Sequence, residues 1–547
     1  MAFSRFFQRA APRRAGAVAK RTFATCPPYA TLDPYTISGS NPCTLYNLEG
    51  GEWKSAEKTI SIPDPLNGEP FVVVPDTQVS ELGPFLENAK SCPKSGLHNP
   101  LKNPERYVMY GEIMHQAGHE LSSPDTHDFF ARLIQRTMPK SYQQAWYEVK
   151  VTADFFKNFG GDNPRFNAGG QQVAGDREGQ NATNWRWPFG PVCIVSPFNF
   201  PLEIPTLQLG GALMMGNRPT LKCDSVVAPV MEQLVRMLIH CGMPATDMDL
   251  LHSDGPVAGE LIGKDNFRVT QFTGSSTVAE LLAEQTNGKV RLEDAGFDWK
   301  ILGPDVGDVD YVAWQADMDA YACSGQKCSA QSILFAHKNW ADAGIYDKLE
   351  ELAGRRQLSD LSVGPVMTHT TENMLGHMNR LLEIPGAKCL FGGKALEGHT
   401  IPDCYGAIEP TAVFVPLDEM LRPENFKACC TEIFGPFQVV TEFDDDSEAK
   451  VLEACETMSN HLTAAVVSND PRFQARMLKS TVNGTTYTGR KARTTGAPQN
   501  HWFGPAGDPR GAGIGTPYAI QLVWSCHREI IYDEGEVPAD WVMPEAS

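Results

Sequence analysis

The sequence predicts an α/β protein with a Rossmann-like parallel sheet, followed along the chain by a second α/β region. Short apolar segments alternate with helical periodicity between about residues 191 and 285. The expected strands lie at residues 191–195, 218–222 and 267–272, and the expected helices at 206–215, 228–240 and 277–285. Such alternation places each strand parallel to the one before, with the helices packed on the sheet.

The remaining chain supports this arrangement. Apolar residues recur at helical spacing over residues 105–160, whereas residues 160–180 are rich in glycine and irregular. Polar and aromatic residues alternate at 184–187, as in a strand. A second α/β stretch is expected over residues 301–490, and late β structure at 521–524 and 528–532. A chain of 547 residues is long enough for two or three domains.

The composition indicates a globular protein, with 42% hydrophobic and 21% charged residues. The formal net charge is −19, so the surface repels nucleic acid phosphates and anionic membranes. No apolar run reaches the length of a membrane span. We therefore expect neither nucleic acid nor a membrane as a partner.

The first 24 residues differ from the rest of the chain, because they hold six basic residues and no acidic one. Phe3, Phe6 and Phe7 could share one face of an Arg-rich helix, and Arg21 to Ala24 resembles a matrix-peptidase cleavage site. This pattern is typical of a mitochondrial presequence, which predicts the mitochondrial matrix. A chloroplast transit peptide or a plain basic tail are the alternatives.

The chain has 14 cysteines and no Cys-x-x-Cys pair, so we expect free thiols, most of them in the core. Cys323 and Cys328 have no second pair of candidate ligands, and we expect no metal.

Four separated segments carry candidate chemistry. They are PFNFP at residues 197–201, FTGSS at 272–276, LEDAG at 292–296 and GQKCSA at 325–330. Taken singly, each has an ordinary interpretation: a turn Asn, a helix cap, a surface Glu and a buried Cys. The charge of Lys327 beside Cys328 could also lower the pKa of the thiol.

Taken together with EIFGPF at residues 432–437, these segments resemble the aldehyde dehydrogenase family, and the resemblance extends from about residue 40 to the C-terminus. Glu293 precedes Cys328 by 35 residues, close to the separation in that family. The resemblance implies an NAD-binding domain over residues 25–300, with an oligomerisation hairpin near 167–190. It further implies a catalytic domain over 301–490, and an anchor loop with oligomerisation strands over 491–547 of a homo-oligomer.

The resemblance also implies the roles of single residues. Cys328 is the covalent nucleophile, Glu293 the general base, and the Asn199 amide an oxyanion donor. The implied NAD contacts are Ser196, Pro197, Phe198, Lys222, Gly274, Ser275, Glu432 and Phe434.

One departure from the family concerns the choice between NAD and NADP. Ser225 stands where an acidic residue usually follows the lysine, with Asp224 beside it. An acidic side chain there binds the ribose 2′-hydroxyl and repels a 2′-phosphate. The sequence favours NAD and leaves NADP open.

The residues around Cys328 resemble the branch of the family that oxidises glutamate semialdehyde, formed from Δ1-pyrroline-5-carboxylate, in proline catabolism. That resemblance implies that Lys327 and Ser329 contact the amino-acid carboxylate and that Phe200 packs against the aliphatic part. Gly513, in the glycine-rich loop at 510–516, is the implied backbone anchor. Two alternatives remain: an aldehyde dehydrogenase for another small semialdehyde, and a non-catalytic scaffold on the same fold.

Overall fold

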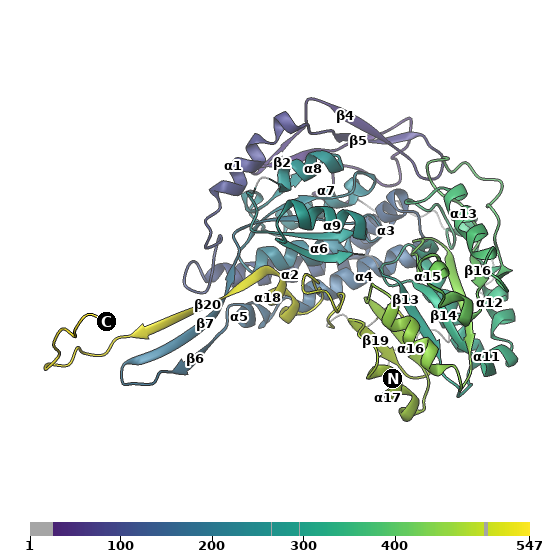
Figure 1. Cartoon of the computed structure of the whole chain (residues 1–547). Coiled ribbons are helices and arrows are strands. Elements are labelled where there is room, and N and C mark those ends of the chain that lie inside the picture. The colour runs from purple at the N-terminus through teal and green to yellow at the C-terminus, as the bar shows by residue number, and fades with distance from the viewer. Residues whose placement is uncertain (1–25, 264, 295, 497–500) are drawn as a thin grey trace.

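The computed structural model describes residues 26–263, 265–294, 296–496 and 501–547. Two lobes lie side by side, and a long β arm projects from the first of them (Figure 1). The expected presequence at 1–24 lies outside the described residues.

A seven-stranded sheet forms the centre of the first lobe. Its strand order is β12-β11-β8-β9-β10-β2-β3. The first five are parallel, and β2 and β3 join antiparallel at one edge. The strands are β2 (Asn47–Glu49), β3 (Glu52–Lys54), β8 (Pro191–Val195), β9 (Arg218–Lys222), β10 (Asp249–Leu251), β11 (Val269–Gly274) and β12 (Val290–Asp294).

Helices bury both faces of this sheet, which explains why strands such as β8 are apolar throughout. One face packs on α1 (Gly83–Ser91), α8 (Gly255–Ile262) and α9 (Ser276–Gln285). The other packs on α2 (Glu105–Ser122), α3 (Pro124–Thr137), α4 (Tyr142–Asn158), α6 (Glu203–Met214) and α7 (Ala228–His240).

The direction of the chain through this sheet reverses between β8 and β11. From β8 the chain continues to β9 and β10 on one side, and later to β11 and β12 on the other. In parallel α/β sheets, ligands bind at the carboxyl ends of the strands at this switch point. The loops that follow β8 and β11 hold Pro197 and Ser275, two of the predicted cofactor residues.

The second lobe contains another seven-stranded sheet, in the order β15-β16-β17-β14-β13-β18-β19. All neighbours are parallel except β15 with β16. The strands are β13 (Asp298–Leu302), β14 (Gln331–His337), β15 (Lys388–Phe391), β16 (Thr411–Phe414), β17 (Phe437–Phe443), β18 (Thr463–Val467) and β19 (Thr485–Thr488).

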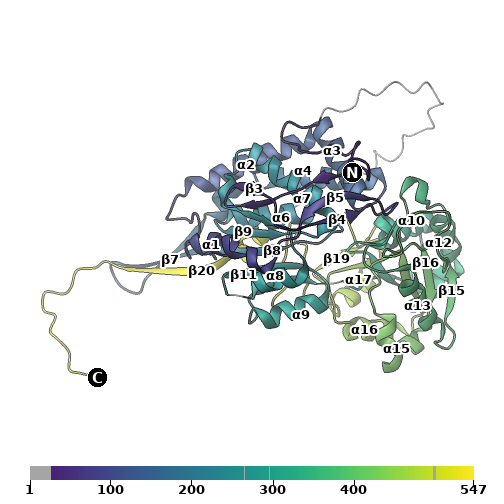
Figure 2. The same cartoon turned by 90° about the horizontal axis from the view of Figure 1, so that it is seen from above.

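This sheet is also covered on both faces, and Figure 2 shows its helices from above. One core contains residues of α10 (Val309–Tyr321), α11 (Lys338–Asp342) and α12 (Ile345–Ala353). The other contains residues of α13 (Thr371–Leu382), α14 (Leu417–Met420), α15 (Pro423–Cys429), α16 (Glu448–Thr457) and α17 (Pro471–Leu478).

Two small sheets complete the fold. An N-terminal sheet joins β1 (Cys43–Thr44), β5 (Pro70–Pro75) and β4 (Thr59–Pro63). The arm pairs β6 (Gly170–Ala174) and β20 (Ser525–Asp533) antiparallel on either side of β7 (Gln180–Pro188). Two short helices, α5 (Asn163–Asn167) and α18 (Pro517–Trp524), pack together at its base.

The predicted fold class is confirmed: a Rossmann-like parallel sheet, a second α/β unit and a small β arm. The β interpretation of residues 521–524 was wrong, since these residues end helix α18. Pro517 lies in the first turn of α18 and the Thr516 side chain caps it, which favours a helix. Among the described residues, no helix is long and apolar enough to cross a membrane.

Candidate active site

The segment before Cys328 has an unusual backbone. Cys323, Ser324 and Gly325 all have left-handed φ angles, of 55°, 55° and 68°. A Cβ atom added at Gly325 would lie 1.9 Å from the main-chain oxygen of Gly435, so only glycine fits there. The close approach packs the loop at residues 432–436 directly against the segment that carries Cys328.

The side chains of Ser324 and Gln326 hold this backbone by hydrogen bonds to the main chain at residues 364–367. The Gly364 N–H donates to Ser324 Oγ at 2.8 Å. The Gln326 side chain donates to the Pro365 oxygen at 3.0 Å and accepts from the Met367 N–H at 2.7 Å. Because left-handed residues other than glycine are disfavoured, these contacts are needed to hold the turn.

Cys328 and Glu293 lie close enough for each side chain to shift the pKa of the other. Glu293 is the next-to-last residue of strand β12 and is 4% exposed. Burial raises its pKa to about 7. Burial and the Glu293 carboxylate raise the pKa of the Cys328 thiol well above its usual value. Burial therefore disfavours the charged form of both groups.

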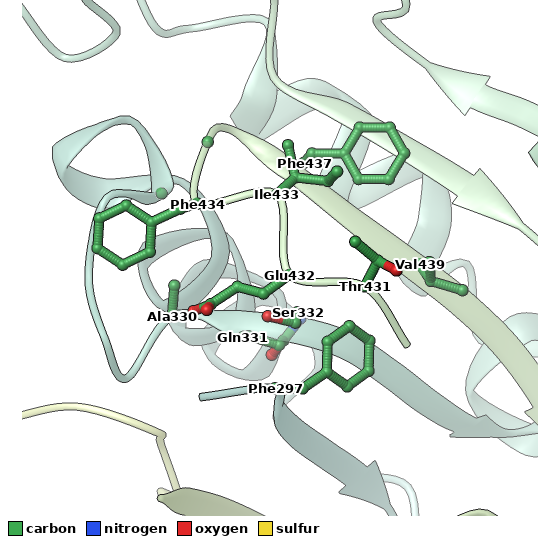
Figure 3. A pocket seen from close by; sticks show the side chains of 12 residues that line it. Phe297, Ala330, Gln331, Ser332, Thr431, Glu432, Ile433, Phe434, Phe437 and Val439 are labelled. Carbon is green, nitrogen blue, oxygen red and sulfur yellow. The ribbon is translucent and has the colours of Figure 1, made fainter. Parts of the chain in front are cut away.

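Glu432 belongs to the same cluster. Burial, Asp298 and Glu293 raise the pKa of its carboxyl, while the Gly296 N–H donates to it and opposes the rise. In Figure 3 Glu432 and Phe434 point to one side of their loop, and Ile433 points to the other. The Phe434 ring meets the Phe198 ring edge-on at 5.9 Å, which joins this loop to the loop after β8.

Asn199 is 3% exposed in the loop after β8. Its main-chain oxygen accepts a hydrogen bond from Lys140 Nζ at 2.7 Å. Its side-chain amide makes no hydrogen bond with another described residue, so the amide N–H groups remain available to a ligand. Phe200, the next residue, is half-buried and packs against the first core.

The predicted cofactor residues gather at the switch point of the first sheet. Lys222 ends β9 beside Val195 of β8, and the Ser196 N–H donates to the Lys222 oxygen at 3.0 Å. Gly274 ends β11, and Ser275 occupies the N-cap of α9 without a side-chain hydrogen bond to the helix. The first N–H groups of α9 thus have no side-chain cap and suit a phosphate, so these residues fit a dinucleotide.

The predicted anchor loop lies against the strand that carries Glu293. The Leu292 N–H donates to the Arg510 oxygen at 2.9 Å, and the Ala512 N–H donates to the Leu292 oxygen at 2.8 Å. Gly513 therefore directly follows Ala512, which is hydrogen-bonded to Leu292, the residue before Glu293. A Cβ at Gly513 would lie 2.2 Å from the Trp502 ring, so this position requires glycine.

The two residues beside Cys328 differ in their surroundings. Ser329 is 7% exposed. The Lys327 ammonium is buried and donates to the Met318 oxygen at 2.9 Å at the end of α10, and burial lowers its pKa. The Lys327 charge lies close to the predicted site, but its ammonium group is hydrogen-bonded to the main chain at Met318.

Sequence reasoning missed several buried polar residues around the site. Asp298 is fully buried, and its pKa is raised well above the usual value by burial. Lys140, Gln144 and Glu148 contact the loops of Asn199 and Cys328. Their sequence context resembles an ordinary amphipathic helix, so no local signal distinguishes them. Among the described residues, no group of three or more His, Cys, Asp or Glu could hold a metal ion.

The comparisons with known proteins agree with this geometry. The sequence model of the "Aldehyde dehydrogenase family" matches residues 53–508. A protein of Linum usitatissimum named as an aldehyde dehydrogenase is 59% identical over 537 residues, covering 98% of both chains. "Delta-1-pyrroline-5-carboxylate dehydrogenase 12A1, mitochondrial" of Arabidopsis thaliana is 58% identical over 521 residues, covering 95% of this chain and 94% of its own.

A solved structure shows the same fold at much lower identity. A betaine aldehyde dehydrogenase variant from Staphylococcus aureus superposes with a TM-score of 0.78 at 18% identity, over 91% of this chain and 98% of its own. The family match over most of the chain, together with the close relatives and the shared fold, shows that this chain belongs to the aldehyde dehydrogenase family.

Proposed function

We propose that this enzyme oxidises L-glutamate 5-semialdehyde, the open form of Δ1-pyrroline-5-carboxylate, to L-glutamate with NAD, a step of proline catabolism. The observation that carries the proposal is the juxtaposition of Cys328 and Glu293 in a chain that is 58% identical to the Arabidopsis enzyme. A half-buried thiol beside a buried carboxyl supplies a nucleophile and a base at one place.

In the first step Glu293 takes the proton from Cys328, and the sulfur attacks the aldehyde carbon. The new C–S bond displaces the carbonyl electron pair onto the oxygen. The Asn199 amide and the Cys328 main-chain N–H donate hydrogen bonds to this oxyanion, where negative charge develops in the transition state.

NAD, when bound, supplies the acceptor for the hydride that leaves this carbon as the C=O bond reforms. Cys328 then holds the acyl group as a thioester. Glu293, after losing the first proton, takes a proton from water, which attacks the acyl carbon and releases the Cys328 sulfur. The products are the carboxylate and the free enzyme.

The cofactor site proposed here lies at the switch point of the first sheet. The uncapped first turn of α9 at Gly274 and Ser275 would hold the pyrophosphate, and Lys222 the adenosine ribose. Ser196, Pro197 and Phe198 would line the crevice, with Glu432 and Phe434 toward the nicotinamide.

Asp224 supports NAD over NADP. Its carboxylate caps the Val226 N–H at 2.9 Å directly after Lys222 and Cys223. A negative charge at this strand end repels a 2′-phosphate, although Ser225 occupies the usual acidic position.

For the substrate carboxylate, we propose the Ser329 hydroxyl and the main chain at Gly513, with the buried Lys327 charge behind them. Phe200 would pack against the methylene groups. The support is the pair of hydrogen bonds at Leu292, because they hold Gly513 beside the strand of Glu293. Backbone N–H groups and a nearby cation suit a carboxylate.

Each part of the chain has its own role in the proposed function. We propose that residues 25–300 bind NAD, that 301–490 carry the nucleophile, and that 491–547 supply the anchor loop and a strand of the arm. The arm, with its hairpin near 167–190, would join subunits of a homo-oligomer.

We also propose that the protein acts in the mitochondrial matrix. The support is the basic segment at 1–24 and the word "mitochondrial" in the name of the Arabidopsis relative.

One assay tests the proposed reaction. Purified protein is supplied with Δ1-pyrroline-5-carboxylate and NAD, and NADH absorbance is followed; we expect steady turnover. Turnover with simple aliphatic aldehydes, but none with this substrate, would refute the substrate assignment. Failure with every aldehyde would favour a non-catalytic scaffold.

A further inference from the structure

A buried ion pair connects the start of α4 with the loop that carries Asn199. Lys140 Nζ and Glu148 Oε2 lie 2.9 Å apart, and both side chains have no exposed surface. Removing two charges from water is unfavourable, and apolar residues of similar volume often give equal or greater stability. A general stabilising role therefore does not account for this pair.

Both members of the pair hold the Asn199 loop by its main chain. Lys140 Nζ donates to the Asn199 oxygen at 2.7 Å. Glu148 Oε1 accepts from the N–H groups of Leu202 and Glu203, at 2.9 and 3.4 Å. These N–H groups begin α6, which has no side-chain cap of its own, so Glu148 caps it from another helix.

The same part of α4 reaches the segment of the nucleophile. Gln144 Oε1 accepts from the Cys323 N–H at 3.2 Å, within the left-handed turn before Cys328. Gln144 and Glu148 are four residues apart in α4 and so share one face of the helix. This face thus contacts two loops that belong to different sheets.

We propose that Lys140, Gln144 and Glu148 are positioning residues that set the place of the Asn199 amide relative to the Cys328 sulfur. The inference rests on the proposed function, since it assigns Asn199 to the oxyanion. Donors aimed at developing charge act only within a narrow geometry, and a misplacement of about 1 Å can lower the rate about a hundredfold.

The variant K140M/E148L replaces both charged residues by apolar residues of similar volume, so no unpaired charge stays buried. The matched control is K150M/D154L, because Lys150 and Asp154 form a partly exposed ion pair on the same helix, at 2.5 Å. We expect kcat of K140M/E148L to fall at least about tenfold with NAD affinity near that of wild type. The melting temperature should fall modestly, because the Asn199 oxygen and the Leu202 N–H lose their partners. The control should keep wild-type kcat.

A third variant separates the two contacts. K140M/E148Q keeps an oxygen acceptor for the Leu202 and Glu203 N–H groups but loses the donor to Asn199. It should recover part of the lost kcat. The Gln144 contact is tested by Q144A against Q143A, since Gln143 is the exposed neighbour on α4; only Q144A should slow turnover.

A double-mutant cycle decides whether the pair acts through Asn199. In an N199A background, adding K140M/E148L should change kcat by less than about threefold, because the group that it positions is gone. Additive losses, or wild-type kcat in K140M/E148L, would overturn this inference while leaving the proposed function intact. A wild-type enzyme that oxidises no aldehyde would overturn both.

Discussion

The Glu293 carboxyl lies beside the Cys328 thiol although the two residues belong to segments of different sheets. Glu293 is the next-to-last residue of β12 in the first sheet, and Cys328 precedes β14 of the second. The candidate active site therefore lies where two α/β units meet, and each unit contributes one of the two proposed reacting groups.

The pKa of Glu293 near 7 predicts how the rate depends on pH. The base must be ionised, so the rate of thioester hydrolysis should rise as pH increases through about 7 and reach a plateau above it. Single-turnover and steady-state rates between pH 5.5 and 9 would test this. In E293Q the rise should disappear along with most of the activity; an unchanged rise would assign it to another group.

The negative charge of Glu293 also acts on the thiol. Since that charge raises the Cys328 pKa, E293Q should lower the pH midpoint of Cys328 alkylation by iodoacetamide in the absence of NAD. Peptide mass spectrometry would identify the alkylated cysteine. A midpoint that stays in place or rises would show that Glu293 does not control the free thiol.

Gly325 offers a test of the turn before the nucleophile. G325A adds both left-handed strain and the contact with the Gly435 oxygen, whereas G398A adds only the strain, since nothing lies within 4 Å of its Cβ. We expect G398A to lower the free energy of unfolding by about 1 kcal/mol with normal kcat.

The G325A variant should lose more stability and most of its activity. Thermal denaturation and initial rates would measure both. Equal behaviour of G325A and G398A would contradict the close packing of Gly325 on Gly435.

Gly513 is expected to set affinity for the substrate rather than the rate of chemistry. G513A must displace the Trp502 ring or the loop itself, so KM for Δ1-pyrroline-5-carboxylate should rise at least about tenfold while NAD affinity stays constant. An aliphatic aldehyde without a carboxylate is the control substrate, and its KM should change little. A similar rise for both substrates would refute the anchor role.

The apolar pattern was sufficient to predict much of the first sheet. Segments 191–195, 218–222 and 228–240 match β8, β9 and α7 in both bounds. Buried strands have strong local signals, and α7 is amphipathic with a proline in its first turn. The prediction for segment 521–524 was wrong because a run of only three apolar residues fits a strand or a helix equally well. The packing of Trp524 near Gly211 of α6 cannot be read from the local sequence.

In the candidate site, too, residues within local motifs could be predicted, whereas residues defined by distant contacts could not. Cys328, Glu293 and Glu432 stand in recognisable motifs, and the structure brings them together. Lys140 and Glu148 could not be found from the sequence, since their partners Asn199 and Leu202 lie more than fifty residues away. The resemblance implies that Lys327 contacts the substrate carboxylate, and this stays a prediction. Local sequence could not show that its ammonium donates to the Met318 oxygen, because a long side chain can end at several places.

The most direct test of the account is to trap the covalent intermediate. E293Q is mixed with Δ1-pyrroline-5-carboxylate and NAD, and the protein is examined by intact and peptide mass spectrometry. At pH 9 we predict one burst equivalent of NADH and one glutamyl group on Cys328. Without the Glu293 charge the thiol pKa is lower, so Cys328 still reacts as a thiolate, but no base activates water to hydrolyse the thioester. A glutamyl group on another residue, or a burst that persists in C328A/E293Q, would contradict the assignment of Cys328 as the nucleophile.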